Sequence, residues 1–336
     1  MSTPKEHWRR DKHAFFNFLA LDREGLTDVP QPLHGLEGAL VSSDAGSGSQ
    51  TFVVDIPPGW KSSYDAADAS LELFNLKGDV ALEGDRVGAS GYVHVAQRCG
   101  GAELDSEAGA LSLAFWNPNA PTFPPPYTKN RAMRFWEEPW HASLPDSHGI
   151  MHKSFRLPDP TGDGYDGGPA GHMRLVYIAP GIDAPYEHVH HECFEEIILL
   201  QGDNLLADEG VMGIGSTTLH PQEWWHGPFA TRSGCIVLVH TDAPMGFPWP
   251  PRENDYPIAK AVCEAYLEEA RWDIPTEHTP WAESEWAHLQ DNPEFQKWAK
   301  QAPEFGDKVG QDVVSSFRSA MTFGGDWEWP REKNKN

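Results

Sequence analysis

The chain has 336 residues, of which 50 are acidic and 26 basic, and its formal net charge is -24 at pH 7. Such an acidic chain, which has no Lys/Arg run, lacks the positive surface that nucleic acid and anionic membranes require, so neither is an expected partner. The first residues contain no apolar segment of signal-peptide length, and no window reaches the roughly 18 apolar residues of a membrane span. We therefore expect a soluble, cytoplasmic protein.

Short apolar runs, separated by Gly, Pro, Asp and Asn, predict β-strands along most of the chain. The runs TFVVDI, SLELFNL, YVHVA and LSLAFW come first, and MRLVYIA, EEIILL, STTLH and CIVLVH follow. Their length and their Val, Ile, Tyr and Phe content are typical of an all-β sandwich or barrel. After Pro251, segments such as IAKAVCEAYLEEARW carry apolar residues at helical spacing, which predicts amphipathic helices packed on the β core.

An internal repeat indicates that a domain is duplicated. TFVVDIPPG from Thr51 is similar to RLVYIAPG from Arg174, and LELFNLKGD from Leu71 is similar to EEIILLQGD from Glu195. Two further pairs occur in the same order, each at an offset of about 120 residues, which is too long for a solenoid unit. The predicted organisation is an N-terminal arm over residues 1–32, a first β unit over 33–130, a second over 131–252 and a helical extension over 253–336.

A cluster of polar residues lies at the start of a buried strand in the second copy. In PYEHVHHECFEEIILLQGD, His188 and His190 share one face of an extended strand, and Glu195 opens the strand that follows. The segment GSTTLHPQEWWHGP brings His226 shortly downstream. Three imidazoles and one carboxylate can surround one divalent ion per chain and leave positions open for water or substrate. The alternative is a solvated patch that holds no metal.

These segments resemble the two motifs of the cupin superfamily. The first motif matches at Gly181, His188, His190, Glu195 and Gly202, with one extra residue before His188. The second matches at Gly215, Pro221 and His226, with Glu223 where the family has Gly and Ala230 where it has Asn. More narrowly, EEIILLQGDNLLADEGVMGIGS resembles the cupins of ChrR-type anti-sigma factors and of acetylacetone dioxygenase. The resemblance implies two cupin barrels, of the double-stranded β-helix or jelly-roll type, and the metal ligands His188, His190, Glu195 and His226.

The first copy lacks every one of these ligands. Alignment of the repeats sets Tyr64 against His188, Ala66 against His190 and Leu71 against Glu195, and leaves Gly100 near His226. The first unit is therefore expected to be a degenerate, metal-free cupin that serves as a structural half or contributes walls to the site.

The resemblance implies a non-haem Fe(II) dioxygenase that cleaves a carbon–carbon bond of a small dicarbonyl or phenolic substrate. Zn, Mn, Ni or Co in the same ligand set would instead favour a non-redox lyase or isomerase, because ligand type alone does not choose the metal. A metal-bound regulatory module and a storage or carbohydrate-binding bicupin stay open. The expected partners are a small-molecule substrate and dioxygen, and bicupins often associate as homodimers through strand edges or swapped arms.

Other side chains are candidates by residue type. Tyr177 and Tyr186 are candidate acid–base groups, and Trp225, His240 and Trp60 are candidate substrate-pocket residues. Each can also be read as a hydrogen-bonded or packed core residue.

Overall fold

The computed structural model describes residues 9–27, 29, 31–65, 69–97, 100–118, 130–134, 141–142, 150–156, 173–178, 193–206, 209–227, 229–232 and 234–242. Within these ranges the chain is almost entirely antiparallel β-structure, with one short 3-10 helix, η2 (Phe18–Ala20). The described part of the chain contains no helix that is long and apolar enough to cross a membrane. The expected helical extension, residues 253–336, lies outside the described residues.

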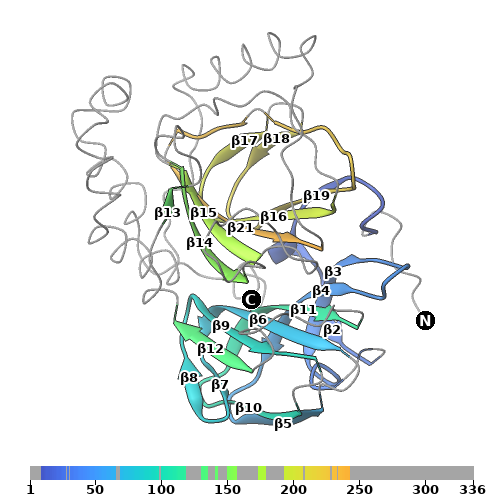
Figure 1. Cartoon of the computed structure of the whole chain (residues 1–336), viewed down its shortest axis with the longest axis vertical. Helices are drawn as coiled ribbons and strands as arrows, with labels where there is room; N and C mark the ends of the chain where they lie inside the picture. Colours follow the sequence, from blue (N-terminus) through green and yellow to red (C-terminus); the bar gives the residue numbers. More distant parts are fainter. Residues whose placement is uncertain are drawn as a thin grey trace, which may run out of the picture.

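The lower body in Figure 1 is a sandwich of two sheets. Its seven-stranded sheet has the order β12-β9-β6-β11-β4-β3-β2, and its four-stranded sheet has the order β5-β10-β7-β8. The strand bounds are β2 Glu24–Gly25, β3 Glu37–Ser43, β4 Gln50–Ile56, β5 Trp60–Asp65, β6 Ser70–Gly78, β7 Val80–Leu82, β8 Asp85–Val87, β9 Gly91–Val95, β10 Gly101–Ser106, β11 Ala110–Asn117 and β12 Arg131–Arg134.

The upper body repeats this arrangement. Its seven-stranded sheet has the order β1-β19-β16-β21-β15-β14-β13, and a three-stranded sheet has the order β18-β17-β20. The strand bounds are β1 Ala14–Asn17, β13 His141–Ala142, β14 Ile150–Arg156, β15 Met173–Ile178, β16 Glu195–Gly202, β17 Asn204–Leu206, β18 Gly210–Met212, β19 Ser216–His220, β20 Phe229–Ala230 and β21 Cys235–Thr241.

Matching glycines mark the repeat at the end of the central strands. Gly78 closes β6 at φ 81°, and Gly202 closes β16 at φ 80°, a left-handed conformation that glycine adopts without strain. A Cβ at either position would collide with a backbone carbonyl, that of Gly109 in the lower sandwich and that of Gly234 in the upper one. The same close approach of backbones therefore occurs twice, at positions that the sequence repeat aligns.

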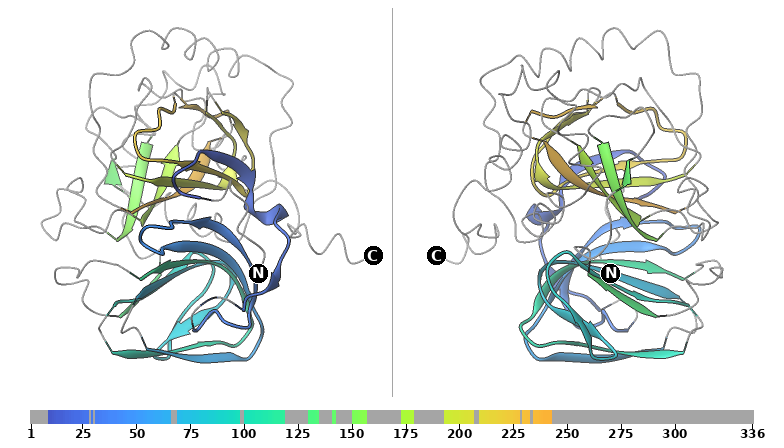
Figure 2. Two further views of the ribbon diagram at one scale, coloured as in Figure 1. Left: turned by 90° about the vertical axis from the view of Figure 1, so that its right-hand side faces the viewer. Right: turned by 60° about the vertical axis from the view of Figure 1, so that its left-hand side comes forward.

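The two sandwiches exchange edge strands. The N-terminal segment runs from β1, which pairs with β19 of the upper sandwich, to β2, which pairs with β3 of the lower one (Figure 2). In return β12, Arg131–Arg134, pairs with β9 of the lower sandwich, although the sequence analysis assigns residues 131–134 to the second unit. Each large sheet thus ends on a strand that lies outside the repeated unit to which the sheet belongs.

The two larger apolar cores among the described residues lie within the lower sandwich and between the two sandwiches. The first fills the interior of the lower sandwich with buried side chains that include Phe52, Leu71, Leu73 and Val93. The second joins the large sheets of both sandwiches, which face each other in Figure 1, and includes Phe74 and Phe115 from below and Leu175 from above. Strand alternation explains the division on β6, where Leu71 and Leu73 face inward and Phe74 and Leu76 face the upper sandwich.

Candidate metal centre

Three polar side chains converge inside the upper sandwich. Glu195 begins β16, His220 ends β19, and His226 lies in the loop after β19. Glu195 and His220 stand directly opposite each other in the antiparallel pairing of β16 with β19, so their side chains lie on the same face of the sheet. One ligand atom from each of the three residues lies within 4.8 Å of the other two, and all three residues are buried.

The bonding of His226 directs one ring nitrogen at Glu195. His226 Nδ1 lies 3.2 Å from the carbonyl oxygen of Trp224, and because a carbonyl oxygen only accepts, Nδ1 carries the proton. In the neutral ring, Nε2 then keeps its lone pair, and this atom lies 3.1 Å from Glu195 Oε2. Two electron-rich atoms at this distance require a cation between them or a proton on one of them.

This donor set fits a divalent metal. Adjacent ligands at about 2.1 Å from an octahedral metal are about 3 Å apart, which matches the separation of His226 Nε2 and Glu195 Oε2. The hydrogen bond from His226 Nδ1 to a backbone carbonyl is the arrangement that commonly fixes the tautomer and orientation of a metal-binding histidine.

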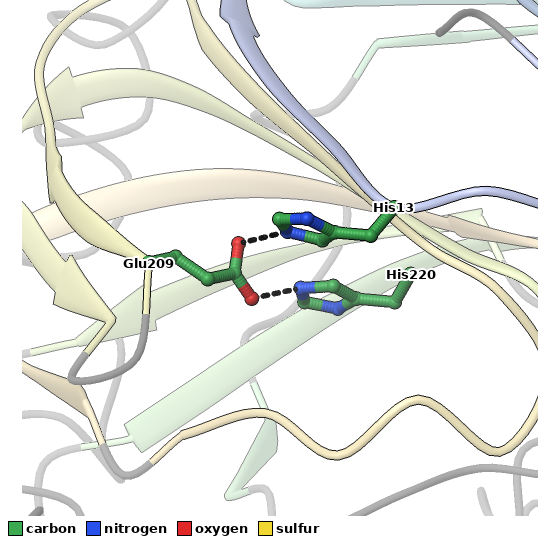
Figure 3. Close-up of side chains that lie close together, drawn as sticks. All are labelled: His13, Glu209 and His220. Carbon is green, nitrogen blue, oxygen red and sulfur yellow. Dashed lines mark hydrogen bonds and ion pairs between the residues drawn. The ribbon is translucent and has the colours of Figure 1, made fainter.

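His220 belongs to a second group as well. Its Nδ1 donates to Glu195 Oε2 at 3.1 Å, and its Nε2 donates to Glu209 Oε1 at 2.7 Å. The other oxygen of Glu209 lies 3.0 Å from Nε2 of His13, which the N-terminal arm contributes just before β1 (Figure 3). We call His13, Glu209 and His220 the outer cluster.

Charge in the outer cluster favours an imidazolium at His220. Burial by itself would lower the pKa of His220, but hydrogen bonds to Glu195 and Glu209 and the charges of these carboxylates raise it to about 9. Burial would likewise raise the pKa of Glu209, and its bonds to His13, His220 and Thr218 outweigh burial and hold that pKa well below its usual range. Two buried carboxylates therefore share one fully buried imidazole.

The structure brings two of the predicted metal ligands together and does not describe the other two. Glu195 and His226 converge as the motif predicts, whereas His188, His190 and the acid–base candidate Tyr186 lie outside the described residues. The full four-residue ligand set therefore stays a prediction.

The other candidates lie elsewhere. His240 pairs with Glu196 across β16 and β21, so it lies on the face opposite Glu195, where its Nδ1 is 3.2 Å from Glu196 Oε2 and its ring lies against Phe115. Tyr177 shares that face, because it lies four residues along β15 from Met173, the partner of His240. The sequence analysis proposed both as residues of the metal site, but in the structure neither side chain faces Glu195 and His226.

The two tryptophan candidates differ in position. Trp60 packs against the interior core of the lower sandwich, away from the converging ligands. Trp225 is half-buried and directly precedes His226, so it keeps its place as a candidate wall of the site.

Sequence analysis missed His220, Glu209 and His13. His220 had a usable signal, because in STTLH the strand period of two places Thr218 and His220 on one face beside Glu195. Glu209 is a turn residue directly before β18, where an acidic residue is ordinary. His13 has no counterpart in the repeat and reaches the cluster only through the pairing of β1 with β19.

The architecture is that of the cupins: a sandwich of a large and a small antiparallel sheet, present twice, with a polar cluster between the sheets of one copy. No protein-family model matches the sequence, and no curated protein matches it. Among solved structures, a Nostoc punctiforme protein described as a "putative dioxygenase" superposes with a TM-score of 0.56 at 18% identity, over 71% of this chain and 88% of that one.

Two further structures are similar over most of their length. YlbA from E. coli superposes with a TM-score of 0.50 at 11% identity, over 69% of this chain and 91% of that one. A cupin 2 conserved barrel domain protein from Leptotrichia buccalis has a TM-score of 0.45 at 9% identity, over 68% of this chain and 96% of that one. The sheet architecture and the likeness to the Nostoc and E. coli structures show that the chain has the cupin fold.

Proposed function

We propose that this protein is a metal-dependent cupin dioxygenase. One divalent ion, Fe(II) in preference to Zn, Mn, Ni or Co, would be held by His188, His190, Glu195 and His226 in the upper sandwich. The substrate would be a small dicarbonyl or phenolic compound in which a carbon–carbon bond is cleaved with dioxygen. The observation that carries the proposal is the buried convergence of His226 Nε2 on Glu195 Oε2 at 3.1 Å.

The repeat supports the two ligands that the structure does not describe. In the lower sandwich, β5 connects β4 to β6, and the corresponding connection in the upper sandwich joins β15 to β16 and contains His188 and His190. Tyr64 on β5, which the repeat aligns with His188, is buried in the interior core of its sandwich. By this equivalence, we expect the His188 side chain to face the interior of the upper sandwich, toward Glu195.

The residues of the chain have distinct roles in this proposal. A bound Fe(II) would supply Lewis acidity toward substrate oxygens and a redox partner for dioxygen. The Glu195 carboxylate offsets part of the positive charge, while the Trp224 carbonyl holds His226 in the tautomer that presents Nε2. The N–H of His220 Nδ1 fixes the Glu195 carboxylate, and the burial of all three side chains limits water in the site.

The Nostoc structure gives this proposal limited support. It shares the fold over 88% of its own length, and its description names a dioxygenase. At 18% identity this likeness shows the fold alone. The proposed reaction therefore rests on the ligand set and on the motif resemblance.

The proposal is tested by metal content and dioxygen uptake on the full chain, purified without a polyhistidine tag or added metal. We expect near-stoichiometric iron, and dioxygen uptake with a substrate from a panel of dicarbonyl and phenolic compounds. His226→Ala should lose the metal and lower the rate at least about 100-fold while the protein stays folded. His34→Ala, which removes an exposed imidazole, is the matched control and should change neither quantity. Equal turnover in wild type and His226→Ala would refute the proposal.

A second candidate function is a non-redox lyase or isomerase. Such chemistry needs a proton-transfer group beside the metal, and His220 is placed for this role, because its Nδ1 is 3.1 Å from Glu195 and its ring stacks on His226 at 4.0 Å between centroids. Full occupancy by zinc, manganese or nickel, with substrate consumed and no dioxygen uptake, would favour this candidate over the dioxygenase.

A further inference from the structure

We infer that the outer cluster, His13 with Glu209 and His220, is a second divalent metal site at the side of the upper sandwich that the N-terminal arm covers. It lies next to the site proposed above and uses a different set of ligand atoms. The inference does not depend on the reaction proposed for the first site.

The donor atoms of the outer cluster are those of a two-histidine, one-carboxylate metal site. One atom from each residue lies within 4.8 Å of the other two. Nε2 of His220 is 2.7 Å from Glu209 Oε1, and Nε2 of His13 is 3.0 Å from Glu209 Oε2, so each carboxylate oxygen faces one imidazole (Figure 3). Such nitrogen and carboxylate donors suit zinc and its neighbours, and a three-ligand set leaves coordination positions for water.

Each ligand of the outer cluster is held by a partner outside it. His220 donates from Nδ1 to Glu195, which is the carboxylate–histidine–metal arrangement common at metal sites. Thr218 donates its hydroxyl to Glu209 Oε2 at 2.5 Å. The ring of His13 stacks on Trp224 with 4.7 Å between centroids. The contacts of His220 and Glu209 fix the direction from which these two donors approach, whereas the stack on Trp224 is the contact that His13 would give up.

Binding requires one movement, and His13 is the residue that can make it. The rings of His13 and His220 are nearly parallel, 8° apart, with centroids separated by 6.1 Å, so their Nε2 atoms face the same carboxylate and not one common point. The His13 side chain is 26% exposed and lies on the N-terminal arm, whereas the His220 side chain is 1% exposed. A bound ion would therefore turn the His13 ring out of its stack on Trp224, and it would release to solvent the proton that His220 Nε2 donates to Glu209 in the metal-free protein.

Charge also favours a cation here. Glu195 and Glu209 are both buried, with side chains 6% and 3% exposed, and they share His220. A metal in the first site balances Glu195, and a second ion in the outer cluster would balance Glu209. In the metal-free protein both carboxylates are paired with His220, and the two ions would take over this pairing once His220 Nε2 has lost its proton.

The test is metal stoichiometry with zinc as the probe. Full-length protein is stripped with a chelator, dialysed against zinc and analysed by mass spectrometry, as wild type and as His13→Ala, His226→Ala and the double variant. We expect two, one, one and zero equivalents, with two retained in the control His34→Ala. Cobalt in place of zinc should show two sets of absorption bands in wild type, and one of them should be missing from His13→Ala.

Each outcome separates the two sites. One equivalent in wild type that is lost in His226→Ala would overturn the second site and leave the proposed function intact. One equivalent that survives in His226→Ala and is lost in His13→Ala would support the second site and overturn the first. Unchanged stoichiometry in His13→Ala would show that His13, Glu209 and His220 form only a hydrogen-bonded cluster. Glu209→Gln, which keeps the side-chain volume, should match His13→Ala, and circular dichroism checks that each variant is folded.

Discussion

In the lower sandwich, Leu71 on β6 stands opposite Val95 on β9; in the upper sandwich, the corresponding pair on β16 and β19 is Glu195 and His220. Both pairs are almost completely buried. Burying each aliphatic side chain contributes about 1.5–3 kcal/mol, whereas a buried ion pair contributes little net stability, because removing its charges from water offsets their attraction. At this position the lower sandwich therefore gains stability from an aliphatic pair, whereas the upper one keeps two ionisable groups that add little.

The largest effect is expected from a carboxylate placed in the interior of the lower sandwich. Leu71→Glu puts a charge where the upper sandwich has Glu195, but within a cluster of aliphatic and aromatic side chains. We expect the free energy of unfolding to fall by about 3–5 kcal/mol, the size of an uncompensated buried charge. Urea denaturation measures the change.

Lys77→Glu is the matched control, because Lys77 is exposed on the same strand, and its effect should stay within about 1 kcal/mol. If Leu71→Glu cost no more than Lys77→Glu, the lower interior would tolerate a charge and the contrast between the sandwiches would disappear.

A pH series on metal-free protein sharpens the comparison, because the ionic cluster belongs to the upper sandwich. The pKa of His220 is raised from 6.5 to about 9 in the folded state, so its contribution is fully present below pH 6.5 and is lost as the pH rises to about 9. The loss should be on the order of 3 kcal/mol. The lowered pKa of Glu209 acts in the opposite direction and removes stability as the pH falls below 4.5.

Urea midpoints between pH 5.5 and 9.5 measure this effect. His220→Gln, which does not titrate, should show a much flatter profile over that range. The same slope in both proteins would mean that His220 is not the group responsible.

The smallest effect concerns the contact between the sandwiches. Thr51 on β4 donates its hydroxyl to Glu196 Oε2 on β16 at 2.9 Å, and both residues are fully buried. Thr51→Val keeps the shape and removes the donor, so unfolding should become easier by about 1–2 kcal/mol. Thr217→Val, which removes a longer 3.4 Å bond within the upper sandwich, should cost less. A larger loss from Thr217→Val would contradict this account of the interface.

Sequence reasoning recovered the features that depend on local pattern or on the repeat. The alternating apolar runs predicted strands, and the cupin resemblance is confirmed by the fold. The motif spacing placed Glu195 near His226, which the structure shows. The unit boundaries and the roles of His188 and His190 stay predictions.

What sequence reasoning missed depends on pairing between distant segments. His240 was a candidate pocket residue by its type, but its register with Glu196 places it on the face toward the lower sandwich. His13 lies beside Glu209 only because β1 pairs with β19. A strand of four residues has too short an alternating pattern for its pairing partner to be predicted from sequence. Register and edge pairing are set by the whole sheet.

The exchange of edge strands also sets an order of events during synthesis. The Nδ2 group of Asn17 donates to the carbonyl oxygen of Ile214, which lies 197 residues later in the chain and must be synthesised first. At about 5–20 residues per second, this delay is roughly 10–40 s, during which the lower sandwich can already fold. The arm therefore pairs late, because His13 can contact Glu209 and His220 only after the whole lower sandwich and the upper strands from β13 to β19 have been synthesised.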